Sequence, residues 1–247
     1  MIAFDGSGNR EVTVRVPAFN FSIDWLPDSR LLVVSGALLL RQEPDASLVT
    51  HTDLGGLPGP GSNEIVVDGR GNIYVNGPGF NLMTGEAPKP GFVALVTPDG
   101  SVRQVADNVA FPNGMAVTPD NSTLILAESY AEKLTAFSIA SDGTLFNQRV
   151  WAEVKGDHPD GICLDAEGAL WYADVGNRHC RRVREGGQVL QTVELDRGCF
   201  ACMLGGEDGR TLYMLAAEWR GPAAMTEGQR TGQVLAMEAP APHTGWP

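Results

Sequence analysis

Three polar residues occupy the same place in a pattern that recurs along this 247-residue chain. Asn63, Asn113 and Asp160 each stand at the head of a short apolar run, which a turn separates from a second apolar run. In a repeat fold, residues at the heads of equivalent strands converge on the symmetry axis. Two amides and one carboxylate that meet there offer the oxygen ligands that hard divalent cations prefer. The pattern therefore predicts an axial metal site and a metal-dependent enzyme.

The alternative is that Asn113-Gly114 and Asp160-Gly161 are merely turn dipeptides. The metal site is favoured because the same residue types precede the same kind of apolar run at the same offset. Ligands that offer only oxygen make Ca²⁺ the expected ion, with Mg²⁺, Mn²⁺ and Zn²⁺ as alternatives. A cage with a single carboxylate is weak, so we expect one more carboxylate from the axial position of the first repeat unit.

Short strands must position these residues. The pattern of apolar run, turn and second apolar run occurs five times, beginning at Phe21, Asn63, Asn113, Asp160 and Ala201. The unit repeats about every 40–50 residues, which is the range of propeller blades. Hairpins with turns such as Asp99-Gly100 and Asp142-Gly143 occupy the intervals, and Asp-Gly is a strong hairpin signal. Each blade is therefore predicted to contain four antiparallel strands, A to D from axis to rim.

The number of strands predicts an all-β, six-bladed β-propeller whose first blade is incomplete. We expect one propeller domain over residues 1–247, with 1–17 as the outer strands of the first blade and 18–247 as the remaining blades. Three strands of a complete ring have no counterpart, as if roughly 40 N-terminal residues of such a ring were missing. A five-bladed ring with loose ends is the alternative. Unpaired blade edges predict either lower stability or a homodimer.

Composition limits the classes of partner. The formal net charge of −12 argues against binding to nucleic acid or anionic membranes. No signal peptide or membrane-spanning segment is apparent, so we expect a cytoplasmic protein.

The cysteines have no zinc-ribbon spacing, and Cys163 lies in an apolar run. Cys199 and Cys202 form a CxxC pair, but the absence of a βαβ context disfavours a redox motif.

Three further residues are candidates to contact a substrate near the axis. Phe21 would make the pocket less polar, and Trp219 could stack on a substrate or simply pack. His158 lies two residues before Asp160 and could line the mouth of the channel, although a solvated loop position is favoured. The sequence has neither a Ser-His-Asp order nor a nucleophile elbow.

Two phrases, Phe111–Asp120 and Pro159–Trp171, resemble the SMP-30/gluconolactonase/regucalcin family. Cys202–Gly206 and the following Thr211-Leu212-Tyr213 are similar to the last blade of that family, and the resemblance extends from about residue 20 to residue 240. It implies a six-bladed propeller with one divalent cation on its axis. It also implies hydrolysis of sugar lactones, while relatives open other lactones or cleave organophosphates.

The resemblance also implies roles for individual residues. Asn113 and Asp160 would bind the metal directly, Asp160 would be the acid/base residue, and Asn63 would hold substrate or a metal-bound water. The remaining ligand of the family, a Glu on the first strand A, has no counterpart in this sequence. Gly61 stands where the family often has Arg, and together with Phe21 it favours a more hydrophobic lactone than a sugar lactone.

These observations support a metal-dependent lactonase as the leading hypothesis. The cation would polarise the ring carbonyl and lower the pKa of a bound water. Asp160 would accept a proton from that water and return it to the alkoxide leaving group. Two alternatives stay open: a catalytically inactive propeller that serves as a binding or scaffold protein, and a phosphotriester hydrolase that uses the same metal cage.

Overall fold

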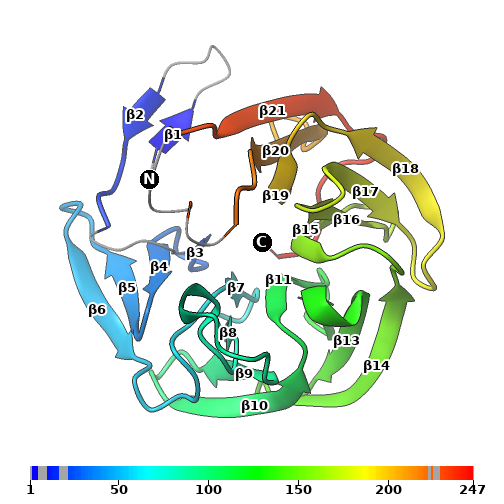
Figure 1. Cartoon of the computed structure of the whole chain (residues 1–247). Coiled ribbons are helices and arrows are strands. Elements are labelled where there is room, and N and C mark those ends of the chain that lie inside the picture. The colour runs from blue at the N-terminus through cyan, green and yellow to red at the C-terminus, as the bar shows by residue number, and fades with distance from the viewer. Residues whose placement is uncertain (1, 5–9, 17–21, 222–223, 225–228, 247) are drawn as a thin grey trace.

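The computed structural model describes residues 2–4, 10–16, 22–221, 224 and 229–246. Its strands form antiparallel sheets arranged in a ring around a central axis (Figure 1). The first sheet is the hairpin of β1 (Ile2–Phe4) and β2 (Arg10–Val12). The next sheet has four strands, β3 (Ser22–Trp25), β4 (Leu31–Ser35), β5 (Leu38–Gln42) and β6 (Leu48–Asp53).

Three more four-stranded sheets follow. One consists of β7 (Ile65–Val67), β8 (Ile73–Gly77), β9 (Gly91–Val96) and β10 (Val102–Val109). The next consists of β11 (Pro112–Val117), β12 (Thr123–Glu128), β13 (Lys133–Ile139) and β14 (Leu145–Glu153). The last consists of β15 (Pro159–Leu164), β16 (Leu170–Asp174), β17 (His179–Val183) and β18 (Val189–Glu194).

The ring ends with a three-stranded sheet of β19 (Gly198–Gly205), β20 (Thr211–Ala217) and β21 (Gln233–Glu238). Two short 3₁₀ helices, Leu82–Thr84 and Ser129–Ala131, lie in loops. Among the described residues, no helix is long and apolar enough to cross a membrane.

The structure confirms an all-β propeller with four-stranded antiparallel blades, but it corrects the predicted number of blades from six to five. Five sheets have three or four strands, and the β1–β2 hairpin lies in the ring between β21 and β6 (Figure 1). The two strands match the expected outer pair of a first blade, and no inner pair joins them within the described residues. Two strands alone do not make a blade, because a blade needs an inner strand facing the axis.

The hydrophobic core consists of layers between neighbouring blades. One layer joins residues of β7–β10 to residues of β11–β14, among them Tyr74, Leu95 and Leu126. The next joins β11–β14 to β15–β18 and contains Trp151 and Tyr172. Since these blades are covered on both faces, β8, β9 and β16 are buried along their whole length. Such strands read as continuous apolar runs rather than alternating ones.

Close packing of the inner strands depends on glycines. A Cβ on Gly114 would lie 2.6 Å from both the carbonyl oxygen of Asp160 and the amide nitrogen of Ile162. A Cβ on Gly161 would lie 2.8 Å from the Cα of Ala201. The dipeptides Asn113-Gly114 and Asp160-Gly161 therefore lie within β11 and β15 rather than in turns, and their glycines let adjacent inner strands approach one another.

A C-terminal segment crosses the other end of the inner strands. Trp246 and Val117 exchange two backbone hydrogen bonds of 2.7 and 2.9 Å, and His243 forms a bridge with Asp165. The same segment reaches the turn after β19, where the amide of His243 donates to Gly209. Figure 1 accordingly places the C-terminus near the centre of the ring.

Candidate functional site

The heads of β7, β11 and β15 are linked by side-chain hydrogen bonds. The Nδ2 group of Asn63 donates to Oδ1 of Asn113 at 3.3 Å and to the carbonyl oxygen of Pro112 at 3.1 Å. The Nδ2 group of Asn113 donates to Oγ of Ser129 at 3.3 Å, and that hydroxyl donates to the carbonyl oxygen of Pro159 at 2.7 Å. The predicted residues Asn63 and Asn113 are thus neighbours, and Ser129 connects them to the residue before Asp160.

A buried amide supports this arrangement from behind. Asn76, at the end of β8, is fully buried and donates from Nδ2 to the carbonyl oxygen of Asn113 at 2.7 Å. Its Oδ1 has no hydrogen-bond partner among the described residues. The backbone of Asn76 also pairs with that of Asn63 and Glu64. These contacts fix the backbone positions from which the axial side chains project.

The Asp160 side chain is partly exposed at the head of β15. Its carboxylate receives no hydrogen bond from the part of the chain that the structure describes. The crowding of protein around it raises the pKa of this carboxyl well above its usual range, and the charges of Glu64 and Asp174 raise it further. An unpaired carboxylate in such surroundings is suited to hold a proton or a cation.

The side chains of the other predicted substrate-binding residues make no hydrogen bond to this network among the described residues. His158 is exposed, and only its backbone amide, which donates to Oδ2 of Asp174 at 2.7 Å, joins the network. Trp219 is 43% exposed, and its ring meets that of Phe200 edge to face at 6.0 Å. Phe200 precedes the axial Ala201, so Trp219 lies on the same side of the ring as the strand heads. Phe21 lies outside the described residues.

Sequence reasoning missed a set of aromatic rings beside Asn113. Phe111 stacks on Tyr130 with ring centroids 4.6 Å apart, and Phe80 lies 5.6 Å from Phe111. Tyr130 follows Ser129 and is 46% exposed. The three residues come from loops of two blades, so their spacing in the sequence does not indicate that their rings are in contact. They form an apolar wall next to the head of β11.

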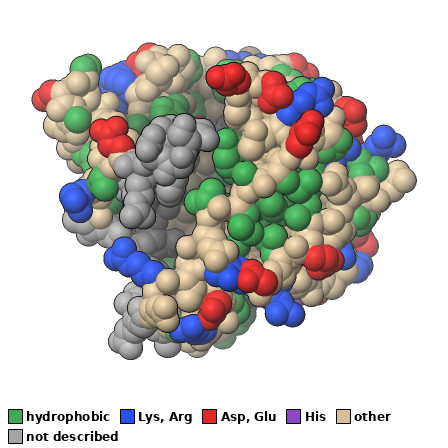
Figure 2. Space-filling model, turned by 90° about the horizontal axis from the view of Figure 1, so that it is seen from above, with side chains coloured by type: hydrophobic (Ala, Val, Ile, Leu, Met, Phe, Trp, Pro, Cys, Tyr) green, Lys and Arg blue, Asp and Glu red, His purple; other side chains and the backbone are tan. Residues whose placement is uncertain are grey.

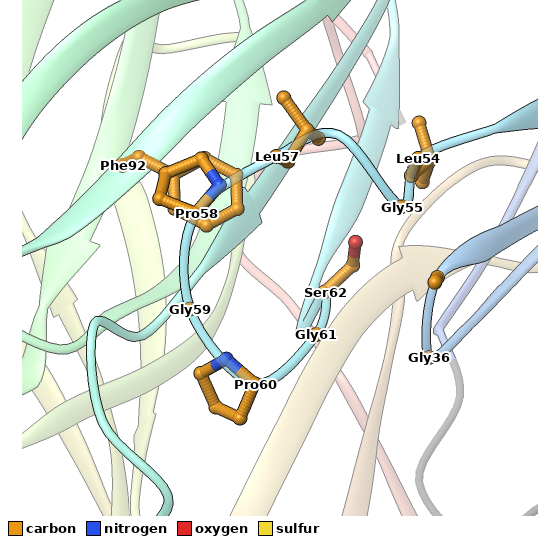
Figure 3. A pocket seen from close by; sticks show the side chains of 11 residues that line it. Gly36, Leu54, Gly55, Leu57, Pro58, Gly59, Pro60, Gly61, Ser62 and Phe92 are labelled. Carbon is orange, nitrogen blue, oxygen red and sulfur yellow. The ribbon is translucent and has the colours of Figure 1, made fainter.

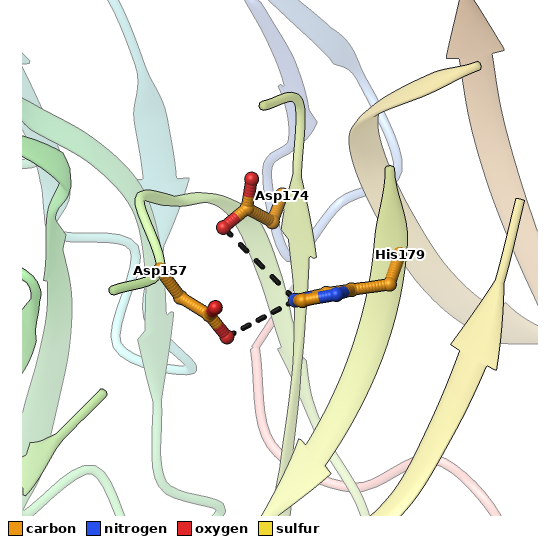
Figure 4. A group of neighbouring side chains, drawn as sticks. All are labelled: Asp157, Asp174 and His179. Carbon is orange, nitrogen blue, oxygen red and sulfur yellow. Dashed lines mark hydrogen bonds and ion pairs between the residues drawn. The ribbon is translucent and has the colours of Figure 1, made fainter. Parts of the chain in front are cut away.

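A second group of titratable residues lies behind the head of β15 (Figure 4). The Nε2 atom of His179 lies 3.0 Å from Oδ2 of Asp157 and 4.0 Å from Oδ2 of Asp174. Two oxygens and one ring nitrogen in this arrangement could hold a metal ion. However, Oδ2 of Asp157 also accepts from the hydroxyl of Tyr172 at 2.5 Å and from Arg181 at 2.7 Å.

Oδ2 of Asp157 therefore already has hydrogen-bond donors within this group. Burial opposes ionisation of Asp157, yet the hydrogen bonds from His179 and Tyr172 hold the pKa of its carboxyl below the ordinary value. A cation would compete with these donors for the same oxygen. The network instead ties the loop before β15 to β16 and β17, and thereby positions the backbone that carries Asp160.

A hollow on the neighbouring blades is lined by the glycine- and proline-rich loop before Asn63 (Figure 3). Gly59 and Gly61 have φ angles of +83° and +143°, a region that favours glycine. A Cβ on Gly77 would come within 2.5 Å of the carbonyl oxygen of Gly61. The positive φ at position 61 favours glycine over arginine there. The residues that line the hollow include no titratable group.

The four cysteines are free and buried. They lie in the apolar layer between β15–β18 and β19–β21. Cys163 therefore packs as a small hydrophobic residue.

The sequence is similar to a known protein family and to several characterised proteins. The family model for the SMP-30/gluconolactonase/LRE-like region matches residues 1–218. Diisopropyl-fluorophosphatase of Loligo vulgaris is 28% identical over 167 residues, covering 63% of this chain and 52% of that protein. Regucalcin of Xenopus laevis is 35% identical over 133 residues, covering 51% of this chain and 44% of that protein. The matches thus span about half the length of these curated relatives.

Solved structures show the same fold. A luciferin-regenerating enzyme superposes with a TM-score of 0.81 over 97% of this chain and 84% of that chain. At 18% identity, this likeness concerns the fold alone.

Proposed function

Since the chain belongs to the SMP-30/gluconolactonase/LRE-like family, we propose that it is a divalent-metal-dependent hydrolase of lactones. The observation that carries the proposal is the unpaired carboxylate of Asp160 beside the linked amides of Asn63 and Asn113. These donors are all oxygen-bearing groups, so they fit a hard cation such as Ca²⁺, the ion that we propose.

Asn63, Asn113 and Asp160 would hold the cation. When bound, the cation would polarise the carbonyl of the lactone ring and stabilise negative charge on its oxygen. Asp160 would take a proton from the attacking water and return it to the alkoxide that leaves the ring. The Asn76 amide and the Ser129 hydroxyl keep the head of β11 in place during these steps.

The surroundings of the site favour an apolar substrate. The Phe111 and Tyr130 rings line one side, with the buried Phe80 ring packed against them, and Trp219 with Phe200 lies near the head of β19. Gly61 provides no cationic side chain to bind the hydroxyl groups of a sugar. We therefore propose a hydrophobic lactone as the substrate, with Trp219 and Tyr130 in contact with its aliphatic part.

Phosphotriester hydrolysis is the second candidate, favoured by the similarity to diisopropyl-fluorophosphatase. The same cation would polarise a phosphoryl oxygen as readily as a carbonyl oxygen. A catalytically inactive propeller that serves as a binding protein is the third candidate.

Titration calorimetry of chelator-stripped protein with Ca²⁺, Mg²⁺, Mn²⁺ and Zn²⁺ tests the cage. Asp160→Asn should abolish saturable binding, while Asp107→Asn, which removes an exposed carboxylate from β10, should leave it unchanged.

Assays with aliphatic lactones, sugar lactones and phosphotriesters then distinguish the hydrolases. Lactone turnover should fall at least about 100-fold in Asp160→Asn. Substantial turnover in that variant would contradict the mechanism, and a lack of cation binding by the wild type would favour the inactive propeller.

A further inference from the structure

Glu64 brings a second carboxylate to the head of β7. It follows Asn63 directly, and successive side chains along an extended chain point to opposite sides. Asn63 reaches Asn113 on one side. On the other side, Glu64 Oε2 accepts a hydrogen bond from the hydroxyl of Ser22 at 2.6 Å. Ser22 is the first residue of β3, so Glu64 lies between two inner strands at the end of the ring where Asp160 lies.

The hydrogen bonding of these carboxylates is incomplete. An ionised carboxylate can accept about four hydrogen bonds. Within the described ranges, Glu64 accepts the single bond from Ser22 and Asp160 accepts none. Both side chains are partly exposed rather than sealed in the core. Leaving carboxylates crowded by protein without donors is costly unless a proton or a cation compensates them.

The two carboxylates lie at the same end of the ring as the linked amides of Asn63 and Asn113. Carboxylates that protein leaves without hydrogen-bond donors are compensated either by a proton or by a cation. The neutral amides of Asn63 and Asn113 favour the cation, because amide oxygens are ligands for hard cations.

On the premise of the proposed function, we infer that Glu64 is a direct ligand of the axial cation and supplies the second carboxylate of the cage. With Asp160 it provides two negative charges, which match the charge of a divalent ion. Ser22 is then a positioning residue that holds the Glu64 carboxylate toward the axis. The affinity of an oxygen cage for a cation depends on its number of charged ligands. The Ca²⁺ affinity of this site therefore depends on Glu64, which lies outside the Asn-Gly and Asp-Gly motifs.

Calorimetric titration of the chelator-stripped full chain with Ca²⁺ tests the inference. Glu64→Gln should weaken Ca²⁺ binding at least tenfold. Glu207→Gln is the matched control, because it makes the same charge change at an exposed residue in the turn after β19. That control should bind as the wild type does. Ser22→Ala should give a smaller loss than Glu64→Gln, since the carboxylate remains.

Thermal unfolding adds a readout that a merely structural role would not produce. Saturating Ca²⁺ should raise the unfolding temperature of the wild type more than that of Glu64→Gln. If Glu64 were only a packing residue, Ca²⁺ would raise the unfolding temperatures of both proteins by the same amount.

Infrared difference spectra of the wild type serve where Glu64→Gln fails to fold. Addition of Ca²⁺ should shift the stretching bands of two carboxylates in the wild type. A shift of a single carboxylate in the wild type would overturn the inference.

The failures of the two proposals are distinguishable. Unchanged Ca²⁺ affinity in Glu64→Gln, with binding lost in Asp160→Asn, would remove Glu64 from the cage and leave the proposed function intact. A wild type that binds none of the four cations would overturn the proposed function as well.

Discussion

Two sectors of the ring differ in how completely other blades cover them. The closed sector, β7–β18, has blades packed on both faces, and strands such as β8 and β9 are buried throughout. The open sector consists of β1–β6 and β19–β21. There, β20 alternates between buried and exposed side chains, and the layer beside β3–β6 on the hairpin side has only Val14, Leu31 and Val33 as its described buried core.

The candidate site spans the boundary between these sectors. Asn113 and Asp160 belong to the closed sector, whereas Glu64 is held by Ser22 of the open sector. Rigid packing can fix the first two residues without a ligand, but the position of Glu64 depends on β3. A bound cation would therefore stabilise the open sector more than the closed one, since it would draw the two together.

The largest effect is expected where the inner strands of the closed sector meet. Gly114→Val should destabilise the protein by more than about 3 kcal/mol, because its side chain would clash with backbone atoms of β15 rather than with movable side chains. Gly56→Ala is the control, since a Cβ there meets nothing within 4 Å. It should change stability by less than about 0.5 kcal/mol. Urea unfolding measures both, and equal effects would contradict the packing argument.

The core layers allow a direct comparison of the two sectors. Leu126→Ala removes a fully buried side chain of β12 and should cost about 2–5 kcal/mol. Leu215→Ala removes a side chain of β20 that is 49% exposed and should cost less than about 1 kcal/mol. Denaturant unfolding of both variants, at protein concentrations too low for association, measures the difference. A cost for Leu215→Ala as large as that for Leu126→Ala would show that its face is covered in solution.

Asp24 in β3 gives the open sector a dependence on pH. Burial raises the pKa of Asp24 to about 7, although hydrogen bonds from the amides of Val67 and Trp25 oppose the shift. As pH rises above about 4, the unfolded chain loses this proton first. The contribution of Asp24 to the free energy of unfolding should therefore fall between pH 4 and about 7 and then level off.

Asp24→Asn isolates that contribution. The difference in unfolding free energy between wild type and variant should change by up to about 4 kcal/mol across this pH window. Urea titrations at several pH values measure the difference, and a constant difference from pH 4 to 8 would mean that the Asp24 pKa is not raised.

The smallest effect concerns association of the open sector. Tyr213, Leu215 and Val234 lie exposed on one face of β20–β21, and Figure 2 shows hydrophobic side chains gathered on that side of the ring. Such a patch favours contact with a second copy. We expect a dimer at micromolar concentration that Leu215→Lys converts to a monomer. Val150→Lys, at an exposed rim residue of β14, should leave the dimer intact. Light scattering measures the mass, and a monomeric wild type would contradict the expectation.

Sequence patterns predicted the blades because turns and apolar runs are local signals. The runs beginning at Asn113 and Asp160 became β11 and β15. The number of blades was wrong, because a count of strands does not say whether two outer strands make a blade.

Contacts between distant residues could not be predicted in the same way. The rings of Phe80 and Tyr130 meet only because two loops lie side by side. Glu64 stood next to a predicted ligand, and strand alternation places it on the opposite side from Asn63. Its pairing with Ser22, 42 residues earlier, becomes visible only in the fold. The network of Asp157, Asp174 and His179 likewise joins a loop to two strands.

The segment that crosses the end of the inner strands has a consequence for local opening. Val117 and Trp246 bond reciprocally, Ala166 donates to the carbonyl oxygen of Pro242, and Thr244 donates to that of Leu164. Release of this segment would free amides on both β11 and the turn after β15. Hydrogen exchange at Val117 and Ala166 should therefore report a common free energy of opening, as in one cooperative unit, although the two residues belong to different blades.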